Sequence, residues 1–256
     1  MNARILVTGG TGRLGQPTVA GLRSRSYPVR ILSRSSGPDH VVGDLATGEG
    51  LDAALNGIET VLHLATSRSK DLDQTRTLLD AMARVAGTTT PAHLIFISIV
   101  GVDRIPYGYY RDKVASEKLI EASGIPHTII RVTQFHGFVA EFLDLQRRLP
   151  VTFVLPMSAQ TIHMPEVAER LIELVDAGPQ GRVADFGGPQ QLTLRESASL
   201  WQAARGIRRP IWALHLPGKT VAAFRTGHHM SGLPGDGRVT FAEYLAEGSR
   251  QARPAE

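Results

Sequence analysis

The sequence contains no cysteine in 256 residues. Without thiols the chain forms no disulfide, has no thiolate ligand for a metal or an iron–sulfur cluster, and has no thiol nucleophile. Any redox chemistry must therefore come from a bound group. The composition is otherwise that of a folded protein, with 42% hydrophobic and 20% charged residues, which excludes a disordered chain and a coiled coil.

Long apolar runs are also missing from the sequence. No stretch approaches the roughly 18 apolar residues that indicate a membrane-spanning helix. The short apolar run at residues 5–7 gives way to glycines, where a signal peptide needs its cleavage site. We therefore expect a cytoplasmic protein with no membrane partner.

Positive charge is in modest excess, with 28 Lys and Arg against 24 Asp and Glu and a net charge of +4. The basic residues are spread along the chain, and no block of five or six of them occurs. A nucleic-acid surface gathers such residues into a patch. We therefore expect no nucleic-acid partner.

The first half of the chain alternates short apolar runs with amphipathic segments, a pattern typical of βαβ units. The expected strands are Arg4–Thr8, Val29–Ser33, Thr60–Leu64, Leu94–Ser98 and His127–Val132. The expected helices are Arg13–Ser24, Leu51–Leu55, Asp71–Val85 and Tyr109–Ala122. The strands are rich in Ile, Val and Leu, as in a sheet covered on both faces. Right-handed crossovers then give an α/β fold with a doubly wound parallel sheet, which binds ligands at the carboxyl ends of its strands.

The pattern loosens beyond residue 132. The expected helices there are Phe138–Arg147, Pro165–Asp176 and Leu194–Ala204, and the expected strands are Val151–Leu155 and Val183–Phe186. Three later segments, Pro210–His215, Thr220–Arg225 and Phe241–Glu247, show a weaker pattern that assigns neither helix nor strand. We expect residues 1–132 to form the sheet domain and residues 133–256 to form a smaller substrate-binding region, some of whose segments return to the sheet.

A glycine-rich turn, TGGTGRLG at residues 8–15, follows the first expected strand and opens a helix. Gly9 permits the tight turn, Gly12 lets a phosphate approach the backbone, and Gly15 lets helix and strand pack. The helix N-terminus adds amide donors and a positive dipole. The turn therefore predicts a bound dinucleotide, and its predicted cofactor-binding residues are Gly9, Thr11, Gly12, Arg13, Leu14 and Gly15.

The end of the second strand indicates which dinucleotide binds. An NAD site has an acidic residue there for the ribose hydroxyl, whereas an arginine accommodates the 2′-phosphate of NADP. This chain has Ser33 and Arg34 and no acid at that point. We therefore predict NADP as the cofactor, with NADPH preferred over NADH; the alternative is that Arg34 is simply solvated.

Four motifs together resemble the short-chain dehydrogenase/reductase superfamily, and its atypical or extended branch of NmrA-like NAD(P)-binding proteins in particular. They are the turn at residues 8–15, Gly43-Asp44-Leu45, His63-Leu64-Ala65-Thr66 and Tyr109-x-x-x-Lys113. The resemblance implies a Rossmann fold, with residues 1–132 as the NAD(P)-binding domain. It also implies that Asp44 and Leu45 contact the adenine, and that Ala65 and Thr66 line the ribose and nicotinamide. The alternatives are a helix N-cap for Asp44 and strand packing for Ala65.

Tyr109 and Lys113 are spaced i, i+4 and lie on one face of the expected helix. A phenol ionises with difficulty at neutral pH, and a nearby ammonium favours the phenolate. The resemblance implies that Tyr109 is the catalytic acid–base and that Lys113 is its partner and a ligand of the nicotinamide ribose. Because Tyr107 and Tyr110 lie beside Tyr109, the alternative is a tyrosine-rich helix start that only packs.

The third catalytic residue of that family departs from its pattern here. The family places a serine one residue after the first serine of the turn that closes the strand expected at Leu94–Ser98, and this chain has Ile99 at that position. Ser98 is therefore the expected substitute. The alternatives are that another group polarises the substrate carbonyl, or that the site binds the cofactor without reductase chemistry.

Residues that follow the strand expected at His127–Val132 are expected to face the substrate. Gln134 and His136 are placed to orient a substrate carbonyl, and Phe135 and Phe138 to form apolar walls. The alternative is that the two phenylalanines belong to the core and that His136 is a loop residue bonded within the protein.

Other chemistries find little support in the sequence. We expect no metal site, because the adjacent pair His228-His229 has no further ligands at a suitable spacing. The chain has no G-x-S-x-G nucleophile turn, and the glycine turn lacks the lysine of a phosphate-transfer loop. We therefore predict an NADP(H)-dependent oxidoreductase that reduces a small organic carbonyl, enone or quinone. The alternatives are a dinucleotide-binding redox sensor without turnover and a sugar-nucleotide epimerase or dehydratase.

Overall fold

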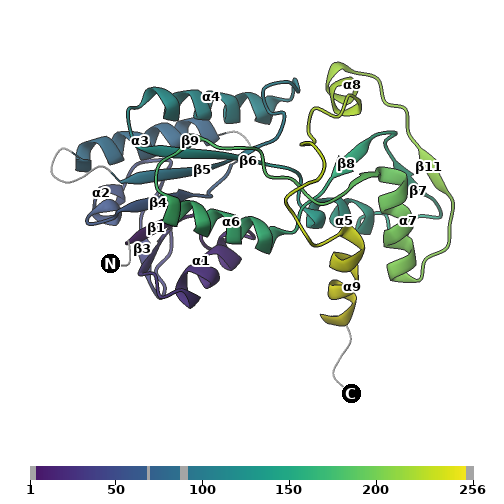
Figure 1. The fold of residues 1–256 in the computed structure, drawn as a ribbon, viewed down its shortest axis with the longest axis horizontal. Coiled ribbons are helices and arrows are strands. Elements are labelled where there is room, and N and C mark those ends of the chain that lie inside the picture. The colour runs from purple at the N-terminus through teal and green to yellow at the C-terminus, as the bar shows by residue number, and fades with distance from the viewer. Residues whose placement is uncertain (1–3, 68–69, 87–91, 252–256) are drawn as a thin grey trace. The chain divides into compact units, whose positions relative to one another are not determined.

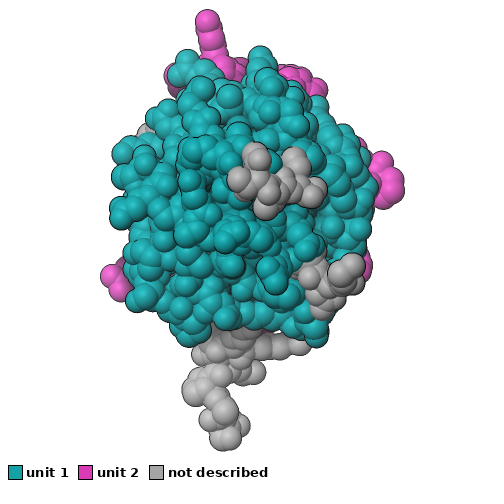
Figure 2. Space-filling model, turned by 90° about the vertical axis from the view of Figure 1, so that its left-hand side faces the viewer, with its two compact units in different colours: residues 1–98, 108–131, 167–184 teal, residues 99–107, 132–166, 185–256 magenta. Residues whose placement is uncertain are grey.

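The computed structural model describes residues 4–67, 70–86 and 92–251. The chain folds into two compact units. Unit 1 comprises residues 1–98, 108–131 and 167–184, and unit 2 comprises residues 99–107, 132–166 and 185–256; Figure 2 shows them in teal and magenta. Neither unit is continuous in sequence, because the chain passes repeatedly between them.

Unit 1 is built on a seven-stranded sheet with the strand order β3-β2-β1-β4-β5-β6-β9 (Figure 1). The strands are β1 (Ile5–Thr8), β2 (Val29–Ser33), β3 (His40–Val42), β4 (Thr60–His63), β5 (His93–Ile99), β6 (His127–Val132) and β9 (Gly181–Arg182). The pairs β1–β2, β1–β4, β2–β3, β4–β5 and β6–β9 are parallel. Every side chain of β1 and β4 is buried, as expected of central strands covered on both faces.

The strand order reverses at β1, because β2 and β3 extend to one side of it and β4, β5 and β6 to the other. In doubly wound sheets, ligands bind at the carboxyl ends of the strands where the order reverses. Here Thr8 at the end of β1 lies beside His63 at the end of β4. The doubly wound α/β fold predicted from the sequence is confirmed, and the reversal identifies the edge of the sheet where a ligand is expected.

Helices cover both faces of this sheet. They are α1 (Gly15–Ser24), α2 (Leu51–Leu55), α3 (Asp71–Ala86), α4 (Gly108–Ala122) and α6 (Met164–Ala177). Helices α3 and α4 lie over one face and α1 and α6 over the other (Figure 1). None of the helices in the described residues is both long enough and apolar enough to span a bilayer.

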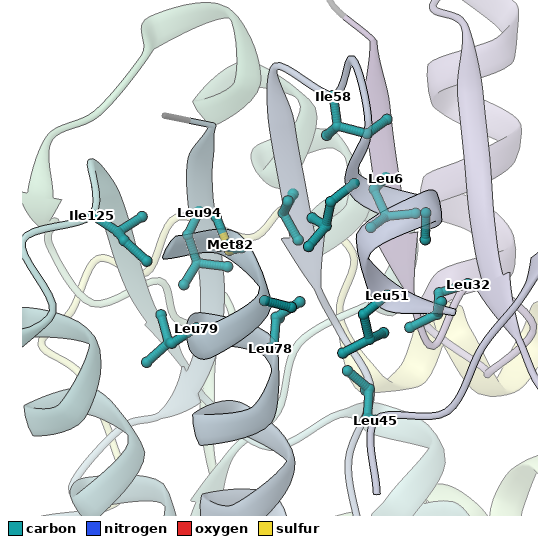
Figure 3. Packing of buried hydrophobic residues seen from close by; sticks show 14 of the residues in the cluster. Leu6, Leu32, Leu45, Leu51, Ile58, Leu78, Leu79, Met82, Leu94 and Ile125 are labelled. Atoms are coloured by element: carbon teal, nitrogen blue, oxygen red, sulfur yellow. The ribbon is translucent and has the colours of Figure 1, made fainter. Parts of the chain in front are cut away.

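The hydrophobic core of unit 1 lies between the sheet and helices α2, α3 and α4. Leu6 and Leu94 come from the strands, and Leu51, Leu78 and Met82 come from the helices (Figure 3). Each of these side chains is at least 96% buried, and burial of one such side chain stabilises the fold by about 1.5–3 kcal/mol. This core fixes the strand ends and the helix starts that carry the candidate site.

Unit 2 has a core of its own. Its elements are α5 (His136–Asp144), β7 (Thr152–Val154), β8 (Ser158–Gln160), β10 (Gln191–Thr193), α7 (Leu194–Arg205), β11 (Ile211–Ala213), α8 (Lys219–Arg225) and α9 (Phe241–Gln251). Strand β7 pairs with β11 in parallel, and β8 pairs with β10 in antiparallel. Trp201 of α7 is fully buried and donates its indole N–H to Asp144 of α5 at 2.9 Å.

The predicted elements of residues 4–132 are all present within two residues of their expected ends. Two later predictions need correction. The strand predicted at Val183–Phe186 does not form, because the residues that pair with β6 are those of β9, just before it; the helix predicted at Phe138–Arg147 begins and ends earlier, as α5. The three-residue strands β3, β8 and β10 were not among the predicted segments. The domain boundary at residue 132 stays a prediction, although β9 shows that a later segment does join the sheet.

Candidate functional site

The glycine turn between β1 and α1 has no room for side chains at its two ends. Gly9 has φ of +70°, and a Cβ there would lie 2.6 Å from the backbone nitrogen of Ala65. A Cβ on Gly15 would collide with the carbonyl oxygen of Gly9 and lie 2.6 Å from the Cα of Gly10. Gly12 differs, since its nearest neighbour would be the Gly9 carbonyl oxygen at 3.1 Å. The roles predicted for the first and third glycines therefore follow from the geometry, and Gly12 keeps an open side.

The start of α1 completes a cradle for an anion. The Gly12 N–H donates to the Gly9 carbonyl at 2.9 Å and closes the turn. Thr11, Gly12 and Arg13 are exposed, and the first turn of α1 contains no acidic residue. Because the first amide groups of a helix have no partner within the helix, this end attracts negative charge. The turn therefore fits the diphosphate of a dinucleotide.

Arg34 follows β2, the neighbour of β1, and its side chain is exposed. Two nearby arginines are engaged by the protein. Arg23 forms an ion pair with Asp39 at 2.7 Å, and Arg30 donates to the Ala54 carbonyl at 2.6 Å. Arg34 has no ion pair with any residue that the structure describes. Its guanidinium is therefore available to an outside anion.

The segment after β3 lies beside the end of β2, because the Gly43 N–H donates to the Ser33 carbonyl at 3.0 Å. Asp44 accepts from the Ala46 N–H at 2.8 Å and so stabilises a turn; it is not the N-cap of α2, a position that Gly50 occupies. The Leu45 side chain packs in the core of unit 1 (Figure 3). The contact of Asp44 and Leu45 with an adenine stays a prediction.

His63 joins the ends of β1 and β4. Its Nδ1 lies 2.7 Å from the Thr8 hydroxyl, and its Nε2 lies 3.4 Å from the Thr75 hydroxyl. Because Thr75 donates its own proton to the Asp71 carbonyl, Nε2 of His63 carries the ring proton and Nδ1 accepts from Thr8. Burial lowers the pKa of His63 to about 3, so the ring is neutral.

Four side chains form a continuous network at this edge of unit 1. The Tyr109 hydroxyl lies 2.8 Å from Oγ1 of Thr66. Thr66 donates to Oδ2 of Asp71 at 2.9 Å, and Nζ of Lys113 lies 3.2 Å from the same oxygen. The i, i+4 pair predicted on α4 is thus connected through two residues from the β4–α3 connection.

Lys113 is almost completely buried. Its side chain is 5% exposed, lies over the Phe96 ring at 4.6 Å from the centroid and donates to the Ile97 carbonyl at 3.4 Å. Burial lowers the pKa of Lys113, and the Asp71 carboxylate opposes that change. Asp71 is 2% exposed and also accepts from the Ser67 backbone N–H. The pair is therefore a buried ion pair beneath the partly exposed Tyr109.

The neighbours of Tyr109 differ from it in exposure. Tyr107 is 47% exposed and Tyr110 is 6% exposed, whereas Tyr109 is intermediate and is the one bonded to Thr66. Its location therefore supports a role other than packing alone.

Ser98 does not join this network. Its side chain is 1% exposed, and its hydroxyl has no hydrogen-bond partner among the described residues. Sequence analysis missed Asp71 as a site residue, because an aspartate that opens a helix already has a structural explanation. Thr66 was expected near the nicotinamide, but its bond to Tyr109 was not foreseen.

The predicted substrate residues lie in unit 2. His136 is 1% exposed; its Nε2 donates to the Val239 carbonyl at 2.9 Å and its Nδ1 accepts from Thr161 at 2.7 Å. Burial lowers the pKa of His136 to about 4. Of the two predicted alternatives, the structure therefore supports a histidine bonded within the protein, which has no ring nitrogen left to orient a substrate.

The other three residues predicted to contact the substrate differ in how far their side chains are exposed. Phe138 is 58% exposed and Phe135 is half-buried. The Gln134 side-chain carbonyl accepts from the Phe135 N–H at 3.0 Å. Phe138 is therefore the one that offers a large open apolar surface.

Comparison with known proteins adds sequence relatives. Residues 9–176 match the family model described as NAD(P)H-binding. The chain is 30% identical over 276 residues to the photosystem II assembly factor Ycf39 of Cyanophora paradoxa, which covers 95% of this chain and 81% of that protein. It is 29% identical over 220 residues to a (4-alkanoyl-5-oxo-2,5-dihydrofuran-3-yl)methyl phosphate reductase of Streptomyces griseus, which covers 81% of this chain and 75% of that protein.

A solved structure shares the fold. The NADPH-dependent quinone oxidoreductase QOR2 of Escherichia coli, complexed with NADPH, superimposes with a TM-score of 0.79 at 20% sequence identity. The superposition covers 95% of this chain and 99% of that one. At this identity the likeness shows the fold alone.

Proposed function

We propose that this chain, which belongs to the NAD(P)H-binding family, is an NADP(H)-dependent reductase that transfers a hydride to a small organic carbonyl, enone or quinone. One observation carries the proposal: the Tyr109 hydroxyl lies 2.8 Å from Thr66, in the connection that follows β4. Ala65, the residue before Thr66, packs directly against Gly9 of the glycine turn. An acid–base group and a dinucleotide cradle therefore share one edge of unit 1.

The chemistry divides between the cofactor and the protein. When bound, the nicotinamide supplies the hydride. The turn at Gly12 and the start of α1 hold the diphosphate through backbone N–H groups. Tyr109 exchanges a proton with the substrate oxygen, and the buried charge of Lys113 supports it through Asp71 and Thr66.

NADPH is the preferred form of the cofactor in this proposal. Arg34 follows the strand next to the glycine turn and has no ion pair within the described part of the chain. A guanidinium binds a phosphate through charge-assisted hydrogen bonds. The absence of an acidic residue beside it also removes the usual partner for the ribose hydroxyl of NAD.

The position of Ser98 bears on the class of substrate. An isolated carbonyl needs a donor for its developing negative charge, and the Ser98 hydroxyl is buried and forms no hydrogen bond with Tyr109. An enone or a quinone spreads that charge by conjugation and depends less on such a donor. The similar reductase of Streptomyces griseus has, by its name, an alkanoyl-oxo-dihydrofuran as substrate.

A dinucleotide-binding sensor without turnover is the second candidate. Ile99 in place of the expected catalytic serine favours it. So does the similarity to a photosystem II assembly factor, whose name describes no reaction.

Turnover with a panel of quinones, enones and ketones separates the two candidates. We expect oxidation of NADPH, followed by its absorbance, with at least one quinone or enone. Tyr109→Phe removes the hydroxyl and lowers kcat by about a hundredfold or more, while Tyr107→Phe, the matched control on an exposed neighbour, leaves it unchanged. Tight NADPH binding without turnover across the panel would support the sensor instead.

A further inference from the structure

The direction of each hydrogen bond around Tyr109 follows from a count of protons. Asp71 forms a buried ion pair with Lys113 at 3.2 Å, so its carboxylate is ionised and only accepts. Thr66 has a single hydroxyl proton, and it donates that proton to Asp71 at 2.9 Å. Thr66 can therefore only accept from Tyr109, and the Tyr109 hydroxyl proton is directed toward Thr66.

We propose that Asp71 and Thr66 are positioning residues that set which way the Tyr109 hydroxyl faces, and so whether it takes a proton from a substrate or gives one. This inference rests on the proposed reductase function. With Asp71 ionised, Tyr109 turns a lone pair outward and accepts. With Asp71 protonated, the carboxyl donates to Thr66, Thr66 donates to Tyr109, and the phenol proton faces the substrate.

The proton transfers balance along this path. When a substrate alcohol is oxidised, its hydroxyl proton moves to the Tyr109 oxygen and the hydride from its carbon moves to the oxidised nicotinamide. The former Tyr109 proton passes to Thr66, and the former Thr66 proton passes to Oδ2 of Asp71. Reduction runs the same three O–H transfers in reverse, after Oδ2 of Asp71 has taken a proton from the Lys113 ammonium 3.2 Å away, which leaves a neutral amine.

The groups that face Asp71 explain why its charge can control the path. Lys113 of α4 is the cation that favours the ionised carboxylate. His63 of β4 is neutral, because burial holds its pKa at about 3. Glu117, the other carboxylate near Lys113, forms an ion pair with Arg131 at 2.6 Å. Lys113 is therefore the charged partner of Asp71 among these groups, and Thr66 connects the pair to Tyr109.

The hydroxyl beside Tyr109 therefore comes from Thr66, while Ile99 occupies the position where the family has a serine. Thr66 supplies a hydroxyl within hydrogen-bond distance of the phenol from a different strand end. The catalytic residue remains Tyr109, since Thr66 and Asp71 act through it.

An infrared measurement tests the orientation without any need for turnover. The C–O stretch of a tyrosine distinguishes a hydroxyl that donates from one that accepts, and the difference between isotope-labelled protein and its Tyr109→Phe variant isolates Tyr109. We expect a donor signature in the unaltered protein and in Thr66→Ser, and loss of that signature in Thr66→Val. Asp71→Asn places an amide N–H against Thr66 and should convert Tyr109 to an acceptor. Thr77→Val, which removes an α3 hydroxyl bonded to the Asp73 carbonyl, is the matched control.

Kinetics in mixtures of H2O and D2O test the path itself. Several protons moving together give a curved dependence of rate on the deuterium fraction, whereas one proton gives a straight line. We expect a curve for the unaltered protein and for Thr66→Ser. For Thr66→Val we expect a straight line. We also expect kcat to fall by at most about tenfold, with KM little changed.

The outcomes separate this inference from the proposed function. A Thr66→Val enzyme with unaltered kcat and an unaltered curve overturns the path while the reductase function stands. If no substrate turns over, the proposed function fails and the infrared result still decides the orientation. An acceptor signature for Tyr109 in the unaltered protein overturns the inference in either case.

Discussion

Arg34 is the residue whose replacement should separate the two nicotinamide cofactors. Its exposed guanidinium has no ion pair among the residues described, and it follows the strand beside the glycine turn. A hydrogen bond to a charged group contributes about 1.5–3 kcal/mol, and about 1.4 kcal/mol is a tenfold change in affinity. We expect Arg34→Ala to weaken NADPH binding by roughly ten- to a hundredfold and to leave NADH binding unchanged.

Calorimetric titration of both cofactors checks this prediction. Arg25→Ala is the matched control, because Arg25 is also exposed and in unit 1 but lies at the C-terminal end of α1. Equal losses for NADPH and NADH in Arg34→Ala would mean that the arginine does not contact a 2′-phosphate.

The sequence was sufficient to identify those candidate site residues whose role depends on adjacent residues of the chain. Gly9 and Gly15 were identified because a turn between a strand and a helix restricts the backbone locally. Asp71 was not, because its ion-pair partner Lys113 comes from α4 and no spacing in the sequence predicts that contact. His136 was ambiguous for the same reason, since its second partner is the carbonyl of Val239, about a hundred residues away.

At the scale of elements, alanine substitutions in the glycine turn before α1 should distinguish an effect on cofactor binding from an effect on stability. Gly12→Ala places a methyl group on the open side of the turn, with its nearest contact at 3.1 Å. We expect a melting temperature close to that of the unaltered protein and at least a tenfold loss of NADPH affinity, because the methyl group occupies the path of the phosphate. Gly15→Ala forces a methyl group into the backbone of Gly9 and Gly10. It should lower stability by about 1–3 kcal/mol as well as binding.

Thermal unfolding with and without NADPH measures both effects. A ligand at a hundred times its Kd stabilises the native state by about 2.7 kcal/mol. This stabilisation by NADPH should disappear in Gly12→Ala, while the melting temperature without NADPH stays that of the unaltered protein. A full ligand-induced gain in Gly12→Ala would show that the phosphate does not approach the turn at that residue.

The elements themselves were predictable to different degrees. The strands of unit 1 are continuous runs of Ile, Val and Leu, and α3 and α4 are long enough to show a helical period. Strands β3, β8 and β10 have three residues each, which is too short for a pattern, and they exist because a neighbouring strand supplies their hydrogen bonds. Strand β9 was displaced for the same reason, since Gly181 and Arg182 are strand residues only through their pairing with β6.

For the whole molecule, alternation of strands and helices sufficed to predict the doubly wound sheet and the edge where its strand order reverses, at which a dinucleotide is expected. It did not suffice for the substrate. The residues predicted to contact it lie in unit 2, where short strands and loops are fixed by distant contacts such as that between His136 and Thr161. The substrate class in the proposed function therefore rests on the chemistry around Tyr109 more than on a recognised pocket.

Buried histidines in both units should make the whole molecule sensitive to acid. Burial lowers the pKa of His63 in unit 1 to about 3 and that of His136 in unit 2 to about 4. In the unfolded chain a histidine binds a proton near pH 6.5. Below about pH 6.5 the unfolded chain therefore holds more protons than the folded one, and stability falls as the pH drops toward 4. Each histidine contributes a loss of up to about 1.4 kcal/mol per pH unit in that window.

Urea unfolding at a series of pH values tests this prediction with a matched pair of variants. His136→Gln removes one titrating ring from a buried position, and His215→Gln removes one from an exposed position. The variant at residue 136 should start from a lower stability at neutral pH, because two internal hydrogen bonds are altered, but its stability should fall less steeply with acid. The variant at residue 215 should follow the unaltered protein throughout. An equal slope for all three proteins would mean that His136 takes up its proton in the folded state as readily as in the unfolded chain, and that the acid sensitivity has another source.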